Sequence, residues 1–100
     1  MNLAKPEQIS NSYGIVYKFA GGTMIQVYTV ETTTNNASIT FVEPFIQPPV
    51  AFATNVFSYS GAIIWSVGST GLTSMNVYLY IVTGDPEIRS ARVIVIGRWK

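Results

Sequence analysis

The chain has 100 residues, which is enough for one domain at the usual size of roughly 100 to 200 residues. With 48% hydrophobic and 11% charged residues, against a globular average of about 25% charged, it is neither intrinsically disordered nor a coiled coil. The net charge of +1 gives no long-range field for nucleic acid, and the absence of His and Cys excludes Ser-His-Asp triads, thiol nucleophiles, disulfides and imidazole-bound zinc.

Residues 1–12 form the first segment, and they combine Lys5, Pro6 and Glu7 with little periodicity. We interpret them as a leader or a link to something upstream, and residues 13–100 as the folded domain. The segment has no basic region followed by an apolar stretch, so it is not a secretory signal. No apolar run in the chain approaches the 18 residues or so of a membrane helix, so we predict no membrane insertion.

The rest of the chain has the period of a β-strand. Side chains alternate from Met24 to Glu31 and from Val50 to Phe57, and no segment has the apolar spacing of a helix. The breaks between apolar runs predict about seven strands: 13–19, 24–31, 38–43, 50–58, 62–67, 72–82 and 89–98. Short strands at such intervals predict an all-β fold, a small antiparallel β-sandwich of about six to seven strands.

The connections contain the residues that turns require. Gly21-Gly22 supplies the positive φ of a tight hairpin, and Gly68 to Gly71 is a second glycine-bounded hairpin. Thr34-Asn35-Asn36 is a connection that tolerates the left-handed region. Pro48-Pro49 cannot donate to a strand ladder, so we expect the chain to cross there from one sheet to the other.

No charged residue occurs between Pro44 and Gly84. A sandwich whose outer faces meet water normally places charged or strongly polar residues outward along each strand. Strands without charge on either face are expected if one sheet packs against other subunits, since such edges are prone to aggregate in a monomer. The sequence therefore predicts an obligate oligomer.

The order of several short motifs adds a resemblance. They are Gly22-Thr23-Met24-Ile25-Gln26, Phe41-Val42-Glu43-Pro44-Phe45 leading to Pro48-Pro49, Thr70-Gly71-Leu72-Thr73, and a closing Val93-Ile94-Val95-Ile96-Gly97-Arg98-Trp99. In this order the chain resembles the C-terminal domains of bacteriophage tail fibre proteins over about residues 20–100. Two departures from the family pattern are the second proline after the corner, which affects the loop around Gln47, and Leu72 in place of a common Phe at a core position.

The resemblance implies a β-sandwich similar to H-type lectins, assembled as a homotrimer at the far end of a fibre. In that family the domain attaches the virion to a host surface polysaccharide. It also implies that residues 1–12 link to an upstream fibre shaft and that the protein is part of the virion after synthesis in the bacterial host cytoplasm. The sequence has no cofactor motif and no set of oxygen-rich segments for a metal, so we expect neither a cofactor nor a metal.

Sugar recognition uses an aromatic face together with short polar side chains or a bidentate arginine. The chain supplies such groups as Tyr59, Trp65, Tyr78, Tyr80 and Trp99, beside Ser58, Ser60, Asn76 and Arg98. If the chain enters at the shaft side and each of seven strands reverses direction, a distal site draws on Gln47, Ser69, Thr70, Arg98 and Trp99. A lateral groove between subunits would use Tyr59 and Trp65. For each aromatic residue, burial in the core or in a subunit interface is the alternative.

The prediction is therefore a trimeric fibre tip that binds a host glycan without covalent chemistry. A purely structural trimerisation cap without a receptor site is the alternative, and a small cytosolic lectin unrelated to phage is a third interpretation. Enzymatic activity is not expected, because the only carboxylates in the body of the domain are Glu31, Glu43, Asp85 and Glu87. The turn that holds Asp85 and Glu87 is interpreted as solvated rather than as a metal site.

Overall fold

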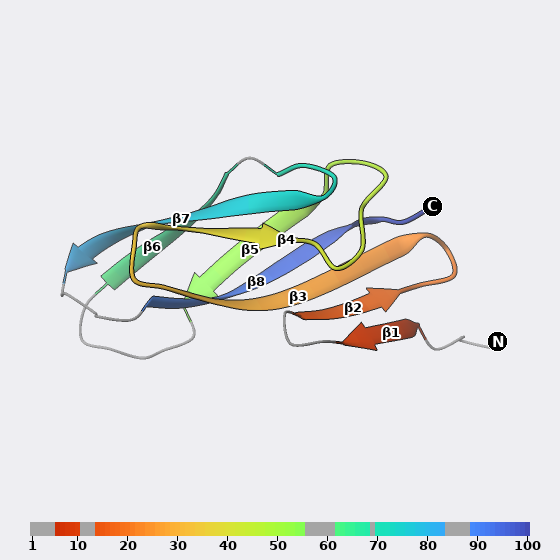
Figure 1. Ribbon diagram of the computed structural model, residues 1–100, viewed down its shortest axis with the longest axis horizontal. Helices are drawn as coiled ribbons and strands as arrows, with labels where there is room; N and C mark the ends of the chain where they lie inside the picture. Colours follow the sequence, from red (N-terminus) through yellow and green to blue (C-terminus); the bar gives the residue numbers. More distant parts are fainter. Residues whose placement is uncertain (1–5, 11–13, 56–61, 69, 84–88) are drawn as a thin grey trace.

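Two antiparallel β-sheets packed face to face make up the domain, as shown in a computed structural model that describes residues 6–10, 14–55, 62–68, 70–83 and 89–100 (Figure 1). The described part contains strands and connections and no helix, so the predicted all-β antiparallel fold is confirmed. No segment of the described chain is a helix long and apolar enough to cross a membrane.

The larger sheet has five strands in the order β1-β2-β3-β8-β5. Their bounds are β1 Glu7–Ser10, β2 Gly14–Lys18, β3 Thr23–Thr32, β8 Arg89–Arg98 and β5 Val50–Asn55. Strand β8 is central: it pairs with β3 along ten residues and with β5 on its other side. Its residues Val93 to Ile96 are all aliphatic: Val93 and Val95 are buried in the core, and Ile94 and Ile96 lie exposed on the outer face.

The smaller sheet has three strands in the order β4-β7-β6. Their bounds are β4 Asn36–Thr40, β7 Ser74–Thr83 and β6 Ala62–Gly68. Figure 1 shows β4 and β7 lying over the larger sheet. The inward side chains of the two sheets form one core: Val16, Met24, Tyr28, Ile39, Phe41, Phe45, Met75, Val77, Ala91, Val93 and Val95 are all buried.

The described chain has eight strands rather than about seven. The additional strand is β1, which pairs antiparallel with β2 at the edge of the larger sheet. It contributes one apolar residue, Ile9, to the packing against the core. A four-residue edge strand with a single apolar side chain has no visible period of two, so it could not be predicted from the pattern of apolar residues.

Two predicted connections are confirmed. Gly22 has φ of 104° in the β2–β3 hairpin, where its N–H donates to the Phe19 carbonyl at 2.9 Å. The segment with Pro48-Pro49 carries the chain from β4 in the smaller sheet to β5 in the larger one. The predicted core position Leu72 is instead exposed, because it precedes β7 and lies in the connection from β6.

Candidate functional site

The family-like motifs meet at one end of the sandwich, which we call the closed end. It is made of the β2–β3 hairpin around Gly22, residues 41–49, residues 70–73 and residues 98–100. Backbone hydrogen bonds join them: Phe41 N–H to Thr73 O, Phe45 N–H to Leu72 O, Ile46 N–H to Arg98 O, and Trp99 N–H to Gly22 O, all at 2.9–3.0 Å. The predicted grouping of these connections with the C-terminus is therefore confirmed.

The prediction that this end lies farthest from the entry of the chain is wrong. Glu7 pairs with Lys18, the last residue of β2, so β1 begins beside the β2–β3 hairpin. Figure 1 shows β1 beginning toward the end of the long axis where the C label lies. Strand β1 adds one reversal of the chain to those of the seven predicted strands, so the end away from Glu7 is the one that holds the β3–β4 turn.

A buried polar network fixes the closed end from within. Gln26, fully buried, donates from Nε2 to the Glu43 carbonyl at 2.7 Å, and its Oε1 accepts from the Tyr28 hydroxyl. The Tyr28 oxygen in turn accepts from Val42 N–H at 2.9 Å. Side chains of β3 thus satisfy the backbone of the segment that crosses between the sheets. Burial raises the pKa of Tyr28, and the hydrogen bond from Val42 opposes that rise.

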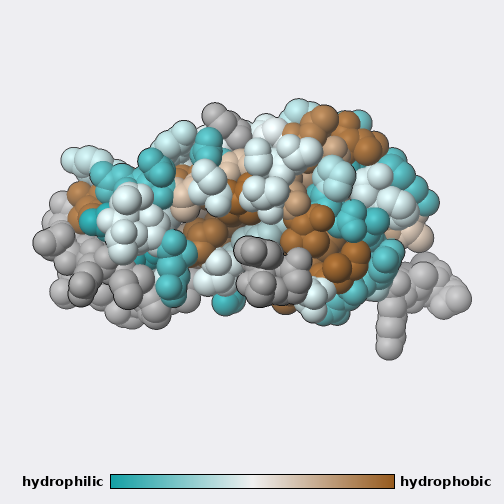
Figure 2. Space-filling view, in the orientation of Figure 1, coloured by the Kyte–Doolittle hydropathy of each residue, from teal (hydrophilic) through white to brown (hydrophobic). Residues whose placement is uncertain are grey.

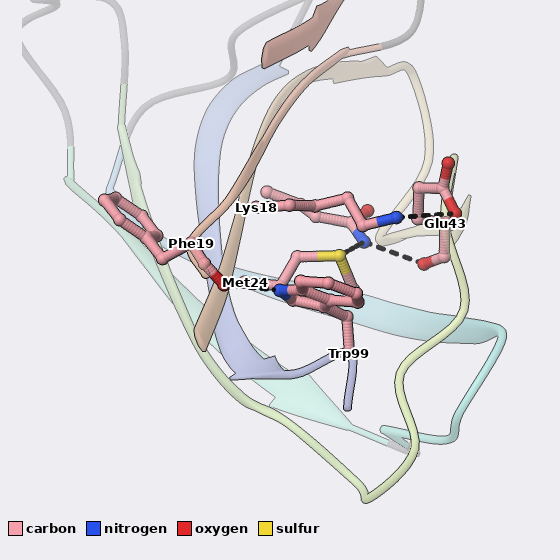
Figure 3. A network of polar contacts seen from close by, with 6 residues as sticks. Lys18, Phe19, Met24, Glu43 and Trp99 are labelled. Carbon is pink, nitrogen blue, oxygen red and sulfur yellow. Dashed lines mark hydrogen bonds and ion pairs between the residues drawn. The ribbon is translucent and has the colours of Figure 1, made fainter. Parts of the chain in front are cut away.

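Trp99 closes this end from outside (Figure 3). Its Nε1 donates to the Phe19 carbonyl at 2.8 Å, and its ring packs against the core. The ammonium groups of Lys18 and Lys100 lie 4.7 and 4.9 Å from the centre of the ring, at cation–π distance. Lys18 also pairs with Glu43 at 3.9 Å. The predicted sugar-stacking residue is thus engaged in intramolecular contacts.

Arg98 is engaged in the same closure. Its Nη2 donates to the Gly21 carbonyl at 2.9 Å and its Nε to the Lys100 carbonyl at 3.2 Å. Gln47, exposed, and Thr70, half-buried, lie in the connections of the same end. The structure therefore brings Gln47, Thr70, Arg98 and Trp99 to one end, with the latter two bound to neighbouring backbone.

The remaining predicted site residues lie elsewhere. Trp65, on β6, packs against the core and donates from Nε1 to Asn55 Oδ1 on β5, so it links the two sheets along one side of the sandwich. Tyr59 and Ser69 lie outside the described residues, as do Asp85 and Glu87. No group of three or more Asp, Glu, His or Cys side chains that could hold a metal occurs within the described part of the chain.

The outer face of the five-stranded sheet carries a surface that sequence reasoning missed. The register aligns Tyr17, Ile25, Ile96 and Val50 in one row across β2, β3, β8 and β5, and Ile15, Val27, Ile94 and Phe52 in the next. We call these eight residues the apolar face. A row of Thr29, Arg92 and Thr54 borders it. The available signal was the uninterrupted aliphatic run of β8, which shows that both faces of that strand are apolar.

Strand β5 places its large and small apolar residues in the opposite way to a strand whose outer face meets water. Its large residues Val50 and Phe52 point outward and are 62% and 57% exposed, whereas the small Ala51 and Ala53 point toward the core. A sheet that meets water normally does the opposite. The composition of β5 is therefore that of a strand whose outer side is covered.

The outer face of the three-stranded sheet is different in kind. Strands β4, β6 and β7 contain no charged residue, and their outward positions are mainly Asn, Ser, Thr and Tyr. The uncharged stretch predicted to form one flank is in fact divided, because β5 belongs to the larger sheet and β6 and β7 to the smaller one. In Figure 2 polar and apolar surface are mixed, with the largest brown areas toward the end where the C-terminus lies.

The fold matches two solved structures of pyocin tail fibres. One is a C-terminal fragment of the R2 pyocin fibre of P. aeruginosa, with a TM-score of 0.73 and 17% identity over 95% of this chain and 26% of that chain. The other is an N-truncated R2-type pyocin tail fibre, with a TM-score of 0.70 and 18% identity over 95% of this chain and 39% of that chain. This chain therefore spans well under half the length of either.

These matches confirm, at the level of the fold, the tail fibre resemblance predicted from the order of the motifs. No protein-family model and no curated protein matches the sequence.

Proposed function

We propose that the chain is a domain of a phage-type tail fibre, which assembles as a homotrimer and holds a host surface polysaccharide noncovalently as part of the virion. The fold match to pyocin tail fibres supports the fibre assignment. The proposed action is binding, without a catalytic step, a cofactor or a metal.

One observation carries the proposal of self-association: the apolar face. Two adjacent rows of four apolar side chains run across four strands, and Val50 and Phe52 are more than half exposed on it. Each Å² of apolar surface removed from water contributes roughly 25 cal/mol, so covering this face with copies of itself stabilises the domain. A trimer rather than a dimer is what the tail fibre resemblance implies.

Binding to the polysaccharide would then gain from avidity, because three weak sites in one trimer act together. In this proposal the upstream shaft joins the domain at the end where Glu7 lies. Gln47 and Thr70 of the closed end, with Tyr59, Ser69 and Trp65, stay candidate contacts for the glycan. Arg98 and Trp99 would contribute only if their intramolecular contacts open.

A second candidate function is a purely structural trimerisation cap. The contacts of Trp99 and Arg98 favour it, since both side chains tie the C-terminus to the β2–β3 hairpin rather than presenting free groups. In this function the closed end locks the fold, and another part of the fibre recognises the host.

Two measurements test these proposals. Sedimentation equilibrium is expected to give particles of three times the 11.0 kDa chain mass, and particles of a single chain mass would contradict self-association. Adsorption of the labelled trimer to a panel of bacterial strains is expected to be saturable on at least one strain. A stable trimer that adsorbs to none would favour the cap.

A further inference from the structure

The outer face of the three-stranded sheet has a composition suited to a ligand other than a copy of the chain. Asn36, Tyr78 and Ser66 lie in one row across β4, β7 and β6, and Ser38 and Asn76 lie beside each other in the next. Tyr80 follows Tyr78 on the same side of β7, and the exposed Ile64 of β6 lies opposite Tyr80 at the border of this set. We call these six residues the polar face. The amide and hydroxyl groups of these residues differ from the aliphatic rows of the larger sheet, so this face does not match the apolar face.

The two tyrosines supply aromatic surface at the centre of the polar face. Tyr80 is 69% exposed and Tyr78 is 42% exposed. The Tyr78 ring lies across the neighbouring strand over Gly68, in space that a side chain at position 68 would fill. Because Gly68 has no side chain, the Tyr78 ring packs over β6 while part of it stays exposed to a ligand.

The polar groups beside the rings supply both hydrogen-bonding functions. Ser38 Oγ donates to Asn76 Oδ1 at 2.9 Å, which orients the Asn76 amide so that its NH₂ group stays available as a donor. Ser38 Oγ keeps lone pairs that accept. A sugar hydroxyl both donates and accepts, so a pair of this kind suits it. Asn76 and Tyr78 are two residues apart on one strand, roughly 7 Å, so one ligand can reach both.

The absence of charge defines the class of ligand. Strands β4, β6 and β7 contain no Lys, Arg, Asp or Glu, so the polar face has no cation of its own to pair with a uronate, sialate or phosphate group. Desolvating such an anion without a partner is unfavourable. Aromatic faces with amide and hydroxyl groups instead suit the apolar and hydroxylated sides of an uncharged sugar.

The position of the polar face agrees with the proposed attachment of the domain. Asn36 is the first residue of β4, so Tyr78, its partner in the register, lies toward the β3–β4 turn and away from Glu7. If a shaft continues upstream from Glu7, this part of the sheet is the more distant one. The polar face also lies on the opposite side of the sandwich from the apolar face, so self-association leaves it open.

From these observations we infer that the polar face is a binding site for a neutral oligosaccharide segment of a surface polysaccharide, with Tyr78 and Tyr80 stacking on the sugar and Asn76 and Ser38 bonding its hydroxyls. This inference rests on the proposed glycan-binding function and adds to it the site and the neutral class of the sugar. It moves the expected recognition away from the closed end.

The test uses the full chain and an array of purified bacterial surface polysaccharides, some neutral and some bearing uronate groups. Saturable binding is expected on at least one neutral polysaccharide. Tyr80→Ala and Asn76→Ala are each expected to weaken it at least tenfold. The matched variants Tyr80→Phe, which keeps the ring, and Arg98→Ala at the closed end are expected to change it less than threefold.

The possible results distinguish failure of the polar-face site from failure of the proposed glycan binding. No binding of the unaltered chain to any polysaccharide would contradict both. Binding that survives Tyr80→Ala and Asn76→Ala but is lost in Arg98→Ala, or binding to uronate-bearing polysaccharides alone, would overturn the polar face and leave glycan binding standing. A fall in the oligomer mass of Tyr80→Ala would show that a second copy covers this face, which would also overturn the inference.

Discussion

The two outer faces of this sandwich differ in a way that charge along the chain does not reveal. Every charged residue that lies in a described strand belongs to the five-stranded sheet: Glu7, Lys18, Glu31, Arg89, Arg92 and Arg98. Yet that sheet carries the apolar face, because most of these residues stand at strand ends. The strands of the three-stranded sheet contain no charge, and their outer face is mostly polar, with Ile64 and two tyrosines also exposed. Which side of a sheet is apolar therefore depends on the cross-strand rows and not on the charge of a segment.

A charge at the centre of the apolar face gives the largest expected effect. Ile94 lies between Val27 and Phe52 in its row, so Ile94→Lys would place an ammonium group in the proposed subunit contact. Burying an unpaired ion costs several kcal/mol, and the cost recurs in every copy. Sedimentation equilibrium is expected to show single chains that keep the β-sheet circular dichroism spectrum.

The matched control is Ser66→Lys, which puts the same charge on the exposed outer side of β6. It is expected to leave the mass unchanged. Equal masses for the two variants, whether both high or both low, would contradict the prediction that only the apolar face mediates self-association.

A substitution at the closed end is expected to lower the stability of the fold without touching either outer face. A Cβ at Gly97 would lie 2.6 Å from Phe45 Cδ1 and 3.0 Å from Pro49 Cβ, and the Phe45 ring is buried among core residues. Overpacking of this kind costs about 1–3 kcal/mol, so Gly97→Ala is expected to lower the denaturation midpoint. Gly21→Ala, where a Cβ meets open space, should leave the free energy of unfolding within about 0.5 kcal/mol of the original.

The next effect comes from the polar network that joins β3 to the crossing segment. Tyr28→Phe removes the hydroxyl that donates to Gln26 and accepts from Val42 N–H. Leaving buried partners unsatisfied costs about 1–3 kcal/mol. The loss of unfolding free energy in Tyr28→Phe is expected near the lower end of this range, because Val42 is only partly buried. Urea unfolding at a fixed protein concentration measures this change in the free energy of unfolding. Tyr80→Phe, an exposed hydroxyl on the polar face, is the control and should change stability little.

Local patterns in the sequence predict much of this fold. The bounds of β8 follow from the breaks on either side of its apolar run, and the hairpin at Gly22 follows from glycine chemistry. The crossing at Pro48-Pro49 follows from the missing N–H groups of proline. The pairing of β8 between β3 and β5 could not be predicted, because strands far apart in the chain are joined by packing and not by a local signal.

The candidate sites could be predicted only in part for the same reason. Trp99 is a suitable sugar-stacking residue by type, but Lys18, far away in the chain, lies over its ring. Tyr78, Tyr80 and Asn76 are also suitable by type, and only the register of β4, β7 and β6 shows that they share one face with Ser38. Residue chemistry gives the class of ligand, whereas the three-dimensional pairing decides which groups are free to bind it.

The smallest expected effect is a loss of stability at high pH that is caused by the ionisation of Tyr28. Burial raises the pKa of this phenol above its ordinary value near 10, so the folded state favours the neutral form. Below about pH 10 both states keep the proton and the contribution is complete. As the pH rises further the unfolded chain releases its proton first, the folded chain binds more protons, and stability falls.

Unfolding of the original chain and of Tyr28→Phe is compared from pH 9 to 11. The stability difference between them is expected to narrow with pH, since the other tyrosines and the lysines titrate in both. A constant difference up to pH 11 would mean that the network does not protect the phenol, and that the link between β3 and the crossing segment is looser than its hydrogen bonds indicate.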